Sequence, residues 1–126
     1  MAKLKLILVY FQALFYVFAG AMHFVSPAVY EPMMPPYLPA HGALILLSGV
    51  AEIAVGGALL VKRIRPYAGW GVVALLVAVW PANLHIAMEN VAVFGAEEGL
   101  GALNWVRFVF QVPLMALAWW STRPET

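Results

Sequence analysis

Long apolar stretches separated by short polar segments are the dominant pattern of this 126-residue chain. A helix needs roughly 20 apolar residues to cross a hydrocarbon core of about 30 Å. Four stretches approach that length: Leu6–Phe24, Gly42–Val61, Tyr67–Met88 and Leu103–Trp120. We therefore predict an all-α fold in which residues 1–126 form a single transmembrane domain, an integral membrane four-helix bundle.

The connections between the stretches differ in character. Lys62–Pro66 is a tight basic turn that suits an antiparallel helix pair. Val25–His41 is much longer and holds five of the nine prolines, which argues against a regular helix or strand there. We expect a proline-rich outer loop between the first two helices. It is either a lid over the mouth of the bundle or a plain interfacial loop held by its tyrosines.

Composition excludes several classes of protein. Hydrophobic residues make up 64% of the chain and charged residues 10%, where a soluble domain carries about 25% charged residues. Much of the surface must therefore face membrane lipid. A net charge of +1 argues against nucleic acid as a partner, because phosphate binding needs a concentrated basic face. Without cysteine, any redox chemistry would belong to a bound cofactor or to a partner protein.

The basic residues indicate the topology. Six of the seven fall on one side of a four-helix arrangement: Lys3, Lys5, Lys62, Arg63, Arg65 and Arg123. By the positive-inside rule that side is the cytoplasm. We expect a multi-pass protein of a bacterial-type inner (cell) membrane with both termini cytoplasmic.

Charged and polar residues at membrane depth are the candidate functional groups, because each costs several kcal/mol unless it is paired or hydrated. At about 1.5 Å per residue from the outer ends of the helices, His23 and His85 lie near the boundary. Arg107 and Asn83 lie deeper, and Glu52 lies near the midplane. The inner half has almost no charged or polar residues, and a transporter pathway would need such residues there.

Helical spacing indicates which of these residues face the interior. Gln12, Tyr16, Ala19 and His23 share one face of the first helix, and Ser48, Glu52 and Gly56 share one face of the second. Arg107 is the one intramembrane cation, so a Glu52–Arg107 ion pair is the simplest way to neutralise both. Such a pair could also be purely structural.

The polar residues of the third stretch do not share one helix face. Asn83 and His85 are two positions apart and cannot face one cavity on an ideal helix. Pro81 could kink the helix and re-aim them, or His85 could pair with Glu89; we favour Asn83 on the inside. Trp80 lies deeper than the other tryptophans and is the aromatic best placed to stack on a ligand. His41 would cap the loop or start the second helix.

A metal site is a weaker interpretation. His23, Glu52 and His85 are suitable ligand types, but their spacing matches no metal-binding motif. We therefore predict no metal ligands.

Several short motifs resemble the DoxX-like family of small four-helix membrane proteins. They are Gly20-Ala21-Met22-His23-Phe24 with Pro27, Met34-Pro35 with Pro39, Ser48-Gly49-Val50-Ala51-Glu52 with Gly56, Pro66, Gly69, and Pro81-Ala82-Asn83. The family includes a membrane subunit associated with thiosulfate:quinone oxidoreductase and a distant branch of receptor-assembly chaperones. The resemblance implies a four-helix bundle with polar positions at His23, Glu52 and Asn83. The chain lacks a cysteine pair, so we expect no direct sulfur chemistry.

These observations favour a membrane subunit of a redox complex that binds a small apolar molecule, namely a quinone. We predict ligand-binding residues His23, Glu52, Asn83, Arg107, Trp80 and Tyr16. The partners would be membrane lipid, the apolar ligand, and a redox partner protein or further copies of the chain. The alternative is a non-catalytic assembly or interaction protein, in which the same residues only lock the bundle. A small transporter is a third alternative.

Overall fold

Four long helices make up most of the computed structural model, which describes residues 1–91 and 99–124. They are α1 (Ala2–Val25), α3 (His41–Leu59), α4 (Arg65–Met88) and α5 (Ala102–Ser121). A short helix α2 (Pro27–Tyr30) and a single 3₁₀ turn η1 (Glu31–Met33) lie between α1 and α3. The described residues contain no strand, so the all-helical prediction is confirmed for them.

Each long helix is long and apolar enough to cross a membrane. Large apolar side chains stay exposed along their outer faces, for example Leu14 at 72% and Phe11 at 67%. This surface suits lipid and is far too apolar for water. The chain therefore has the features of a multi-pass membrane protein.

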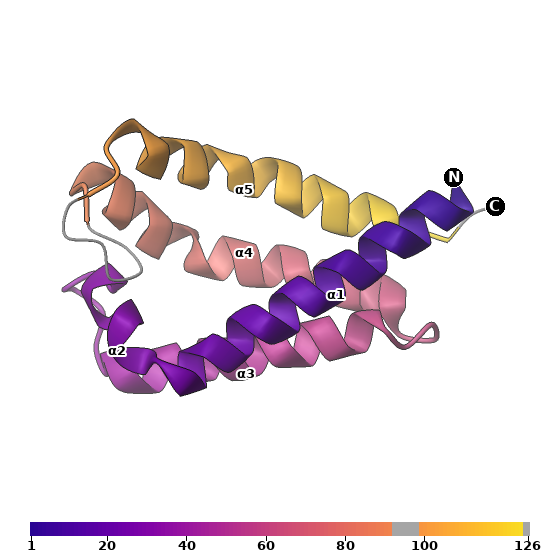
Figure 1. Cartoon of the computed structure of the whole chain (residues 1–126), viewed down its shortest axis with the longest axis horizontal. Helices are drawn as coiled ribbons and strands as arrows, with labels where there is room; N and C mark the ends of the chain where they lie inside the picture. The colour runs from indigo at the N-terminus through magenta and orange to yellow at the C-terminus, as the bar shows by residue number, and fades with distance from the viewer. Residues whose placement is uncertain (92–98, 125–126) are drawn as a thin grey trace.

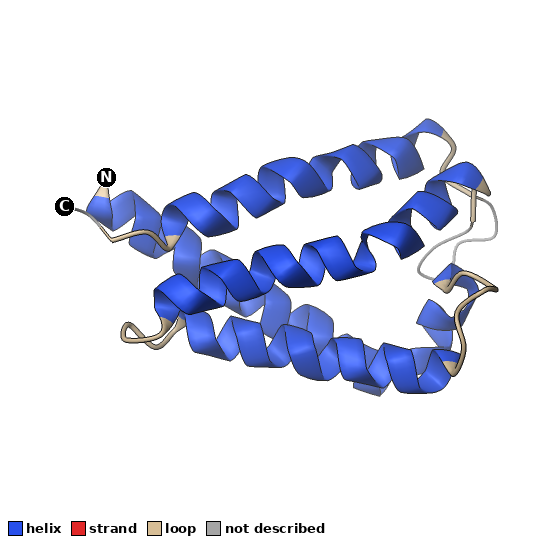
Figure 2. Ribbon diagram, turned by 180° about the vertical axis from the view of Figure 1, so that it is seen from behind, coloured by secondary structure: helices blue, strands red, loops and turns tan. Residues whose placement is uncertain are grey.

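The helices are arranged as two pairs. Figure 1 shows α1 crossing α3 and α4 running beside α5, with both termini at one end of the molecule. The pairs come together toward that end and separate toward the other, where α2 lies. Figure 2 shows α4 bending in its second half, which contains Pro81. Proline has no N–H for the carbonyl one turn earlier, so a bend there is expected.

Glycines allow α1 and α3 to pack closely. A Cβ on Gly20 would lie 2.6 Å from the Gly49 carbonyl oxygen, and one on Gly49 would lie 2.8 Å from the Cβ of His23. One on Gly56 would lie 2.8 Å from Cγ2 of Val17. Side chains larger than hydrogen would hold the two backbones apart, as in other helix pairs of membrane proteins.

The end that holds the termini is packed and also polar. Its buried apolar core joins all four long helices: Val9, Ala13, Tyr16, Leu59, Ala68, Val72, Leu76 and Ala118. Beside it the amide of Gln12 donates to the Ser121 hydroxyl at 2.9 Å, in a buried contact between α1 and α5. A buried polar contact therefore also lies toward the end with the termini, where the sequence led us to expect almost no polar groups. Apolar stretches can hide such pairs, because one glutamine and one serine barely change their hydropathy.

The proline-rich segment is partly helical, contrary to expectation. Pro27 occupies the first turn of α2, and Pro32 lies in the first turn of η1. Proline is tolerated at these positions, because the N–H groups of a first turn have no helical partner. Met33 is buried against Ile86 of α4. The segment therefore packs on the end of the bundle that lies away from the termini (Figure 1).

His41 fixes the far end of this segment. Its Nδ1 lies 2.7 Å from Oε1 of Glu31, and its Nε2 lies 3.0 Å from the Pro35 carbonyl oxygen. His41 is also the first residue of α3. Both roles expected for this histidine are observed together.

Candidate functional site

An acid and a base from different helices meet where α1 crosses α3. Nε2 of His23 lies 3.5 Å from Oε1 of Glu52, and the two side chains are only 11% and 15% exposed. His23 follows Gly20 by one turn, and Glu52 follows Gly49 by one turn. The close glycine crossing therefore places the imidazole beside the carboxylate.

Hydrogen bonding fixes how protons are distributed in this pair. Nδ1 of His23 lies 2.8 Å from the Ile45 carbonyl oxygen, and a carbonyl can only accept, so Nδ1 carries a hydrogen. Nε2 then faces Glu52 either as a donor or as a bare lone pair. A favourable contact requires one more proton, held by Nε2 or by the carboxyl group. His23 and Glu52 are therefore suited to share and exchange a single proton.

Two tyrosines surround the pair. The ring of Tyr30 lies on the imidazole of His23, with centroids 4.2 Å apart and planes 31° from parallel. Burial raises the pKa of Tyr30, and the negative charge of Glu52 raises it further. Tyr16 is buried on α1 and lies close enough to feel the charge of Glu52. Of the residues predicted from sequence, His23, Glu52 and Tyr16 are thus brought together.

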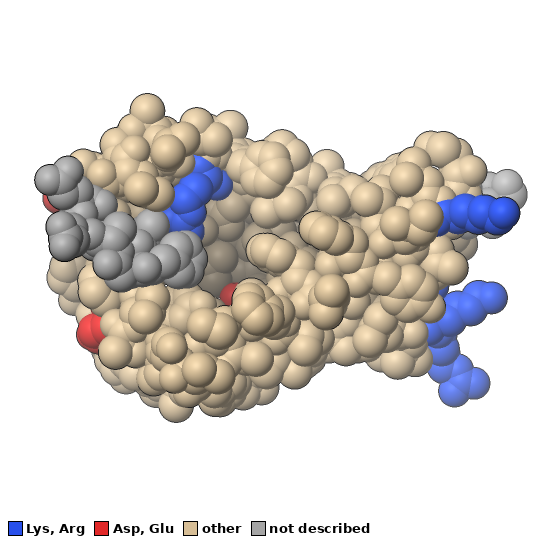
Figure 3. Space-filling model, in the orientation of Figure 1, with Lys and Arg blue, Asp and Glu red and all other residues tan. Residues whose placement is uncertain are grey.

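A hollow opens on one flank of the half of the molecule that contains this pair (Figure 3). Figure 3 shows a hollow between α1 and α5, in the half of the molecule away from the termini, with a basic group at its rim and an acidic group inside. Arg107, on α5, is the basic residue that the sequence places in this half. Glu52 is a mostly buried acid of α3.

The predicted ion pair between Glu52 and Arg107 is not formed. Among the residues that the structure describes, the base within ion-pair distance of Glu52 is His23. The pair was predicted from the membrane depth and the opposite charges of the two residues. Membrane depth does not show which helices are neighbours in the bundle. Since α3 packs most closely on α1, the carboxylate meets the histidine of α1.

Asn83 and His85 lie on different faces of α4. Asn83 is half-buried and shares a face with Leu76 and Ala87, at seven and four residues' separation, and both of these are buried. His85 lies two positions away, and no ion pair links it to Glu89 in residues 1–91. The register places Asn83 toward the interior, although the described residues show no hydrogen bond between Asn83 and Glu52.

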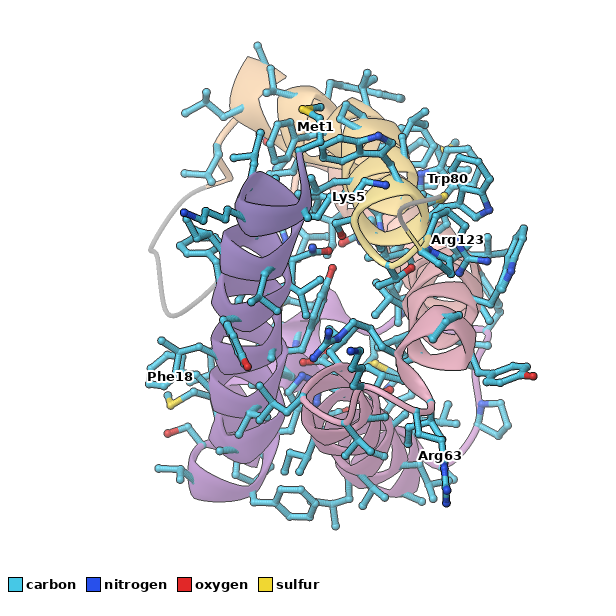
Figure 4. All side chains as sticks on the ribbon, turned by 90° about the vertical axis from the view of Figure 1, so that its right-hand side faces the viewer. Met1, Lys5, Phe18, Arg63, Trp80 and Arg123 are labelled. Carbon is cyan, nitrogen blue, oxygen red and sulfur yellow. The ribbon has the colours of Figure 1, made fainter. Side chains whose placement is uncertain are left out.

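Trp80 is not brought to the pair. Its Nε1 donates to the Phe108 carbonyl at 3.2 Å, and its ring is stacked on Phe108 with centroids 5.0 Å apart. Figure 4 shows Trp80 on the flank of α4 and α5 that faces away from α1. Its observed role is to join α4 to α5.

Sequence reasoning missed a polar cluster at the end of the bundle away from the termini. Asn104 is 1% exposed, and its amide donates to Oδ1 of Asn90 and to the Val91 carbonyl, both at 3.3 Å. Asn90 has a positive φ of 49°, which asparagine tolerates well. An asparagine directly after a helix is a recognisable stop signal and could have indicated this position.

Metal binding gains no support from residues 1–91 and 99–124. Within these ranges no three histidine or carboxylate side chains gather in one place. The site therefore consists of a proton-sharing pair, its tyrosines and an open flank.

Comparison with known proteins adds a family. No curated protein and no solved structure matches the chain significantly. One family model matches residues 12–122, which include α3, α4 and the His23–Glu52 pair. The chain therefore belongs to the family described as a domain of unknown function, DUF8561.

Proposed function

We propose that the chain is a DoxX-like subunit of a redox complex in a bacterial-type inner membrane. It binds a small apolar molecule, a quinone, in the hollow between α1 and α5. The basic end carries both termini and faces the cytoplasm, so the hollow lies in the outer half of the membrane.

The observation that supports this proposal most strongly is the His23–Glu52 pair. Catalysts that exchange protons with a bound molecule need a group that can both give and take a proton near neutral pH. A histidine with one nitrogen fixed by Ile45 and the other facing a carboxylate meets that need. A buried pair that served only to hold helices together would not need an open flank beside it.

The surroundings suit a flat, apolar ligand with oxygen acceptors. The flank opens sideways between α1 and α5, toward the region that lipid would occupy (Figure 3). A lipid-soluble molecule could enter there without crossing water. His23 or Glu52 would donate to one carbonyl of the quinone, and Arg107 and Asn83 are the donors proposed for the other.

The test uses thermal melting of the purified protein with a short-chain ubiquinone analogue. A ligand selective for the native state raises Tm with increasing concentration. We expect such a rise for the native chain and a much smaller one for Glu52→Gln, which keeps the shape of the side chain but cannot exchange a proton. Glu89→Gln removes an exposed carboxylate elsewhere and should keep the full rise.

Two results would contradict the proposal. One is the absence of any shift with quinones across a wide concentration range. The other is an equal shift in the native chain and in Glu52→Gln.

The assembly-protein alternative has one observation in its favour. An open apolar groove of about 380 Å³ runs along the outer face of α5, lined by Trp105, Val106, Val109, Phe110 and Pro113. An apolar transmembrane helix of a partner would fit such a groove. Failure of every ligand in the melting experiment would favour this alternative.

A further inference from the structure

A column of polar groups leads from the end with the termini toward Glu52. At that end Lys5 donates to the Arg123 carbonyl at 3.4 Å (Figure 4). One or two turns further inward the Gln12 amide donates to the Ser121 hydroxyl at 2.9 Å. Tyr16 follows Gln12 by four residues on the same face of α1 and is buried.

The levels of these groups along the bundle can be compared through their contacts. Gln12 and Tyr16 are about 6 Å apart along the axis of α1, at about 1.5 Å per residue. Gly20 lies the same distance beyond Tyr16, and its Cβ would lie 3.0 Å from the Cβ of Glu52. Tyr16 therefore lies midway between Gln12 and Glu52.

Several buried oxygens along this column have no donor. They are Oε1 of Gln12, Oε2 of Glu52 and Oε1 of Gln111. Gln12 and Gln111 are each only 5% exposed. Buried acceptors in proteins are nearly always satisfied, and when no protein donor is present the usual donor is an internal water.

Gln111 lies at the level of Glu52. It precedes Ser121 by ten residues on α5, which is about 15 Å along the helix. Ser121 is level with Gln12, because the two side chains are hydrogen-bonded. Helix α5 runs antiparallel to α1, so Gln111 lies farther from the terminal end than Ser121. This places Gln111 near the level of Gly20 and Glu52. The three unsatisfied oxygens thus come from three different helices around one interior column.

We propose that internal waters on these oxygens form a proton path from the aqueous phase at the terminal end to Glu52, with the Tyr16 hydroxyl as the link between Gln12 and Glu52. This inference rests on the proposed function, because it names the side from which the His23–Glu52 pair is supplied. The path moves protons only. A proton enters from water, each hydroxyl or water on the way accepts one and donates one, and the proton ends on the Glu52 carboxylate.

The apolar core around Tyr16 would restrict the path to protons and to particles no larger than a water molecule, such as a bare Ag⁺ ion. Leu59, Val72 and Leu76 are nearly fully buried in the same layer. A hydroxyl flanked by single waters can still pass a proton by hydrogen-bond exchange, since no heavy atom needs to move through the layer.

Silver labelling of single cysteines tests the path. The chain contains no cysteine, so each variant carries a single thiol. Gln12→Cys and Tyr16→Cys lie on the proposed path, and Phe11→Cys and Phe15→Cys are lipid-facing neighbours at matched depth. Ag⁺ is added on the terminal side of sealed vesicles. Thiols that remain free are then counted by alkylation of the denatured chain and mass spectrometry.

We expect the path cysteines to be blocked at least about tenfold faster than their neighbours, because the reactive thiolate forms only where water is present. Equal rates at positions 12 and 11, and at 16 and 15, would overturn the proposal. Hydroxyl-radical footprinting of the unmodified chain needs no substitution and so does not depend on the folding of any variant. Tyr16 should be oxidised more than Tyr10, which is 50% exposed on the lipid side; the reverse order would equally overturn the path.

The proposed function and the proposed proton path can be contradicted independently of each other. Loss of the quinone-dependent rise in Tm would contradict the function and leave the labelling pattern unaffected. A dry column with a normal rise in Tm would contradict the proton path alone.

Discussion

Glycines at the crossing of α1 and α3 determine whether His23 and Glu52 can meet. Gly20 and Gly49 let the two backbones touch, and each precedes a member of the pair by three residues. The sequence pattern correctly identified the face of Gln12, Tyr16 and His23, all of which are buried. The same pattern included Ala19, whereas the buried residue at the crossing is Gly20.

The first prediction concerns this crossing. Gly20→Ala should destabilise the fold by roughly 1–3 kcal/mol, the usual cost of overpacking, because the new methyl would lie 2.6 Å from a backbone oxygen and 2.7 Å from Cγ1 of Ile53. Gly57→Ala is the matched control. Nothing lies within 4 Å of its Cβ, and alanine favours the helix by up to about 1 kcal/mol.

Thermal melts in one detergent compare these two variants. A lower Tm for Gly20→Ala with an unchanged or higher Tm for Gly57→Ala is the expected outcome. Similar Tm values for both would show that the two helices are not in backbone contact.

Partners of buried charges were the least predictable feature of the site. Glu52 was expected to meet Arg107, since both lie at membrane depth and carry opposite charge. Spacing along one helix defines a face, but the neighbour of that face depends on how the helices are ordered around the bundle. His23 is the partner of Glu52 because the glycine crossing brings α1, and not α5, next to the carboxylate.

At the level of elements, the lengths of the apolar stretches correctly predicted the four long helices. The short helix α2 was not predicted, because its segment is rich in proline. The predicted stretch Leu6–Phe24 is observed as Ala2–Val25, because lysines in a first turn can extend their charged ends into water while the backbone stays helical. Helix α2 was missed because Pro27 was read as a breaker. A proline in the first turn is equally a start signal.

A second prediction concerns how this segment is attached. His41→Ala removes contacts to Glu31 and to the Pro35 carbonyl. Loss of a hydrogen bond worth about 1 kcal/mol should raise the equilibrium constant for local opening about fivefold. Amide hydrogen exchange at Met34 and Leu38 should accelerate by about that factor.

His85→Ala provides the control for this measurement. It changes a histidine at the same end of the bundle for which the described residues show no hydrogen bond or ion pair to Glu31 or Pro35. Unchanged exchange at Met34 in His41→Ala would mean that the segment is held by the burial of Met33 alone.

For the whole molecule, the grouping of charge predicts the orientation. The N-terminus, the C-terminus and the Lys62–Arg65 turn lie at one end, as an even number of crossings requires (Figure 1). Reporter fusions after Arg65 and at the C-terminus should both report the cytoplasm. A periplasmic C-terminus with a cytoplasmic Arg65 fusion would contradict four crossings.

Ligand binding beside the His23–Glu52 pair is the central claim, and native mass spectrometry tests it most directly. Protein released gently from its own membrane should carry a small organic molecule with the mass of a quinone. Glu52→Ala, purified in the same way, should lose most of that adduct, because the donor for the ligand and the partner of His23 are both gone. Bare protein, or the same phospholipid adducts on the native chain and on Glu52→Ala, would contradict the account.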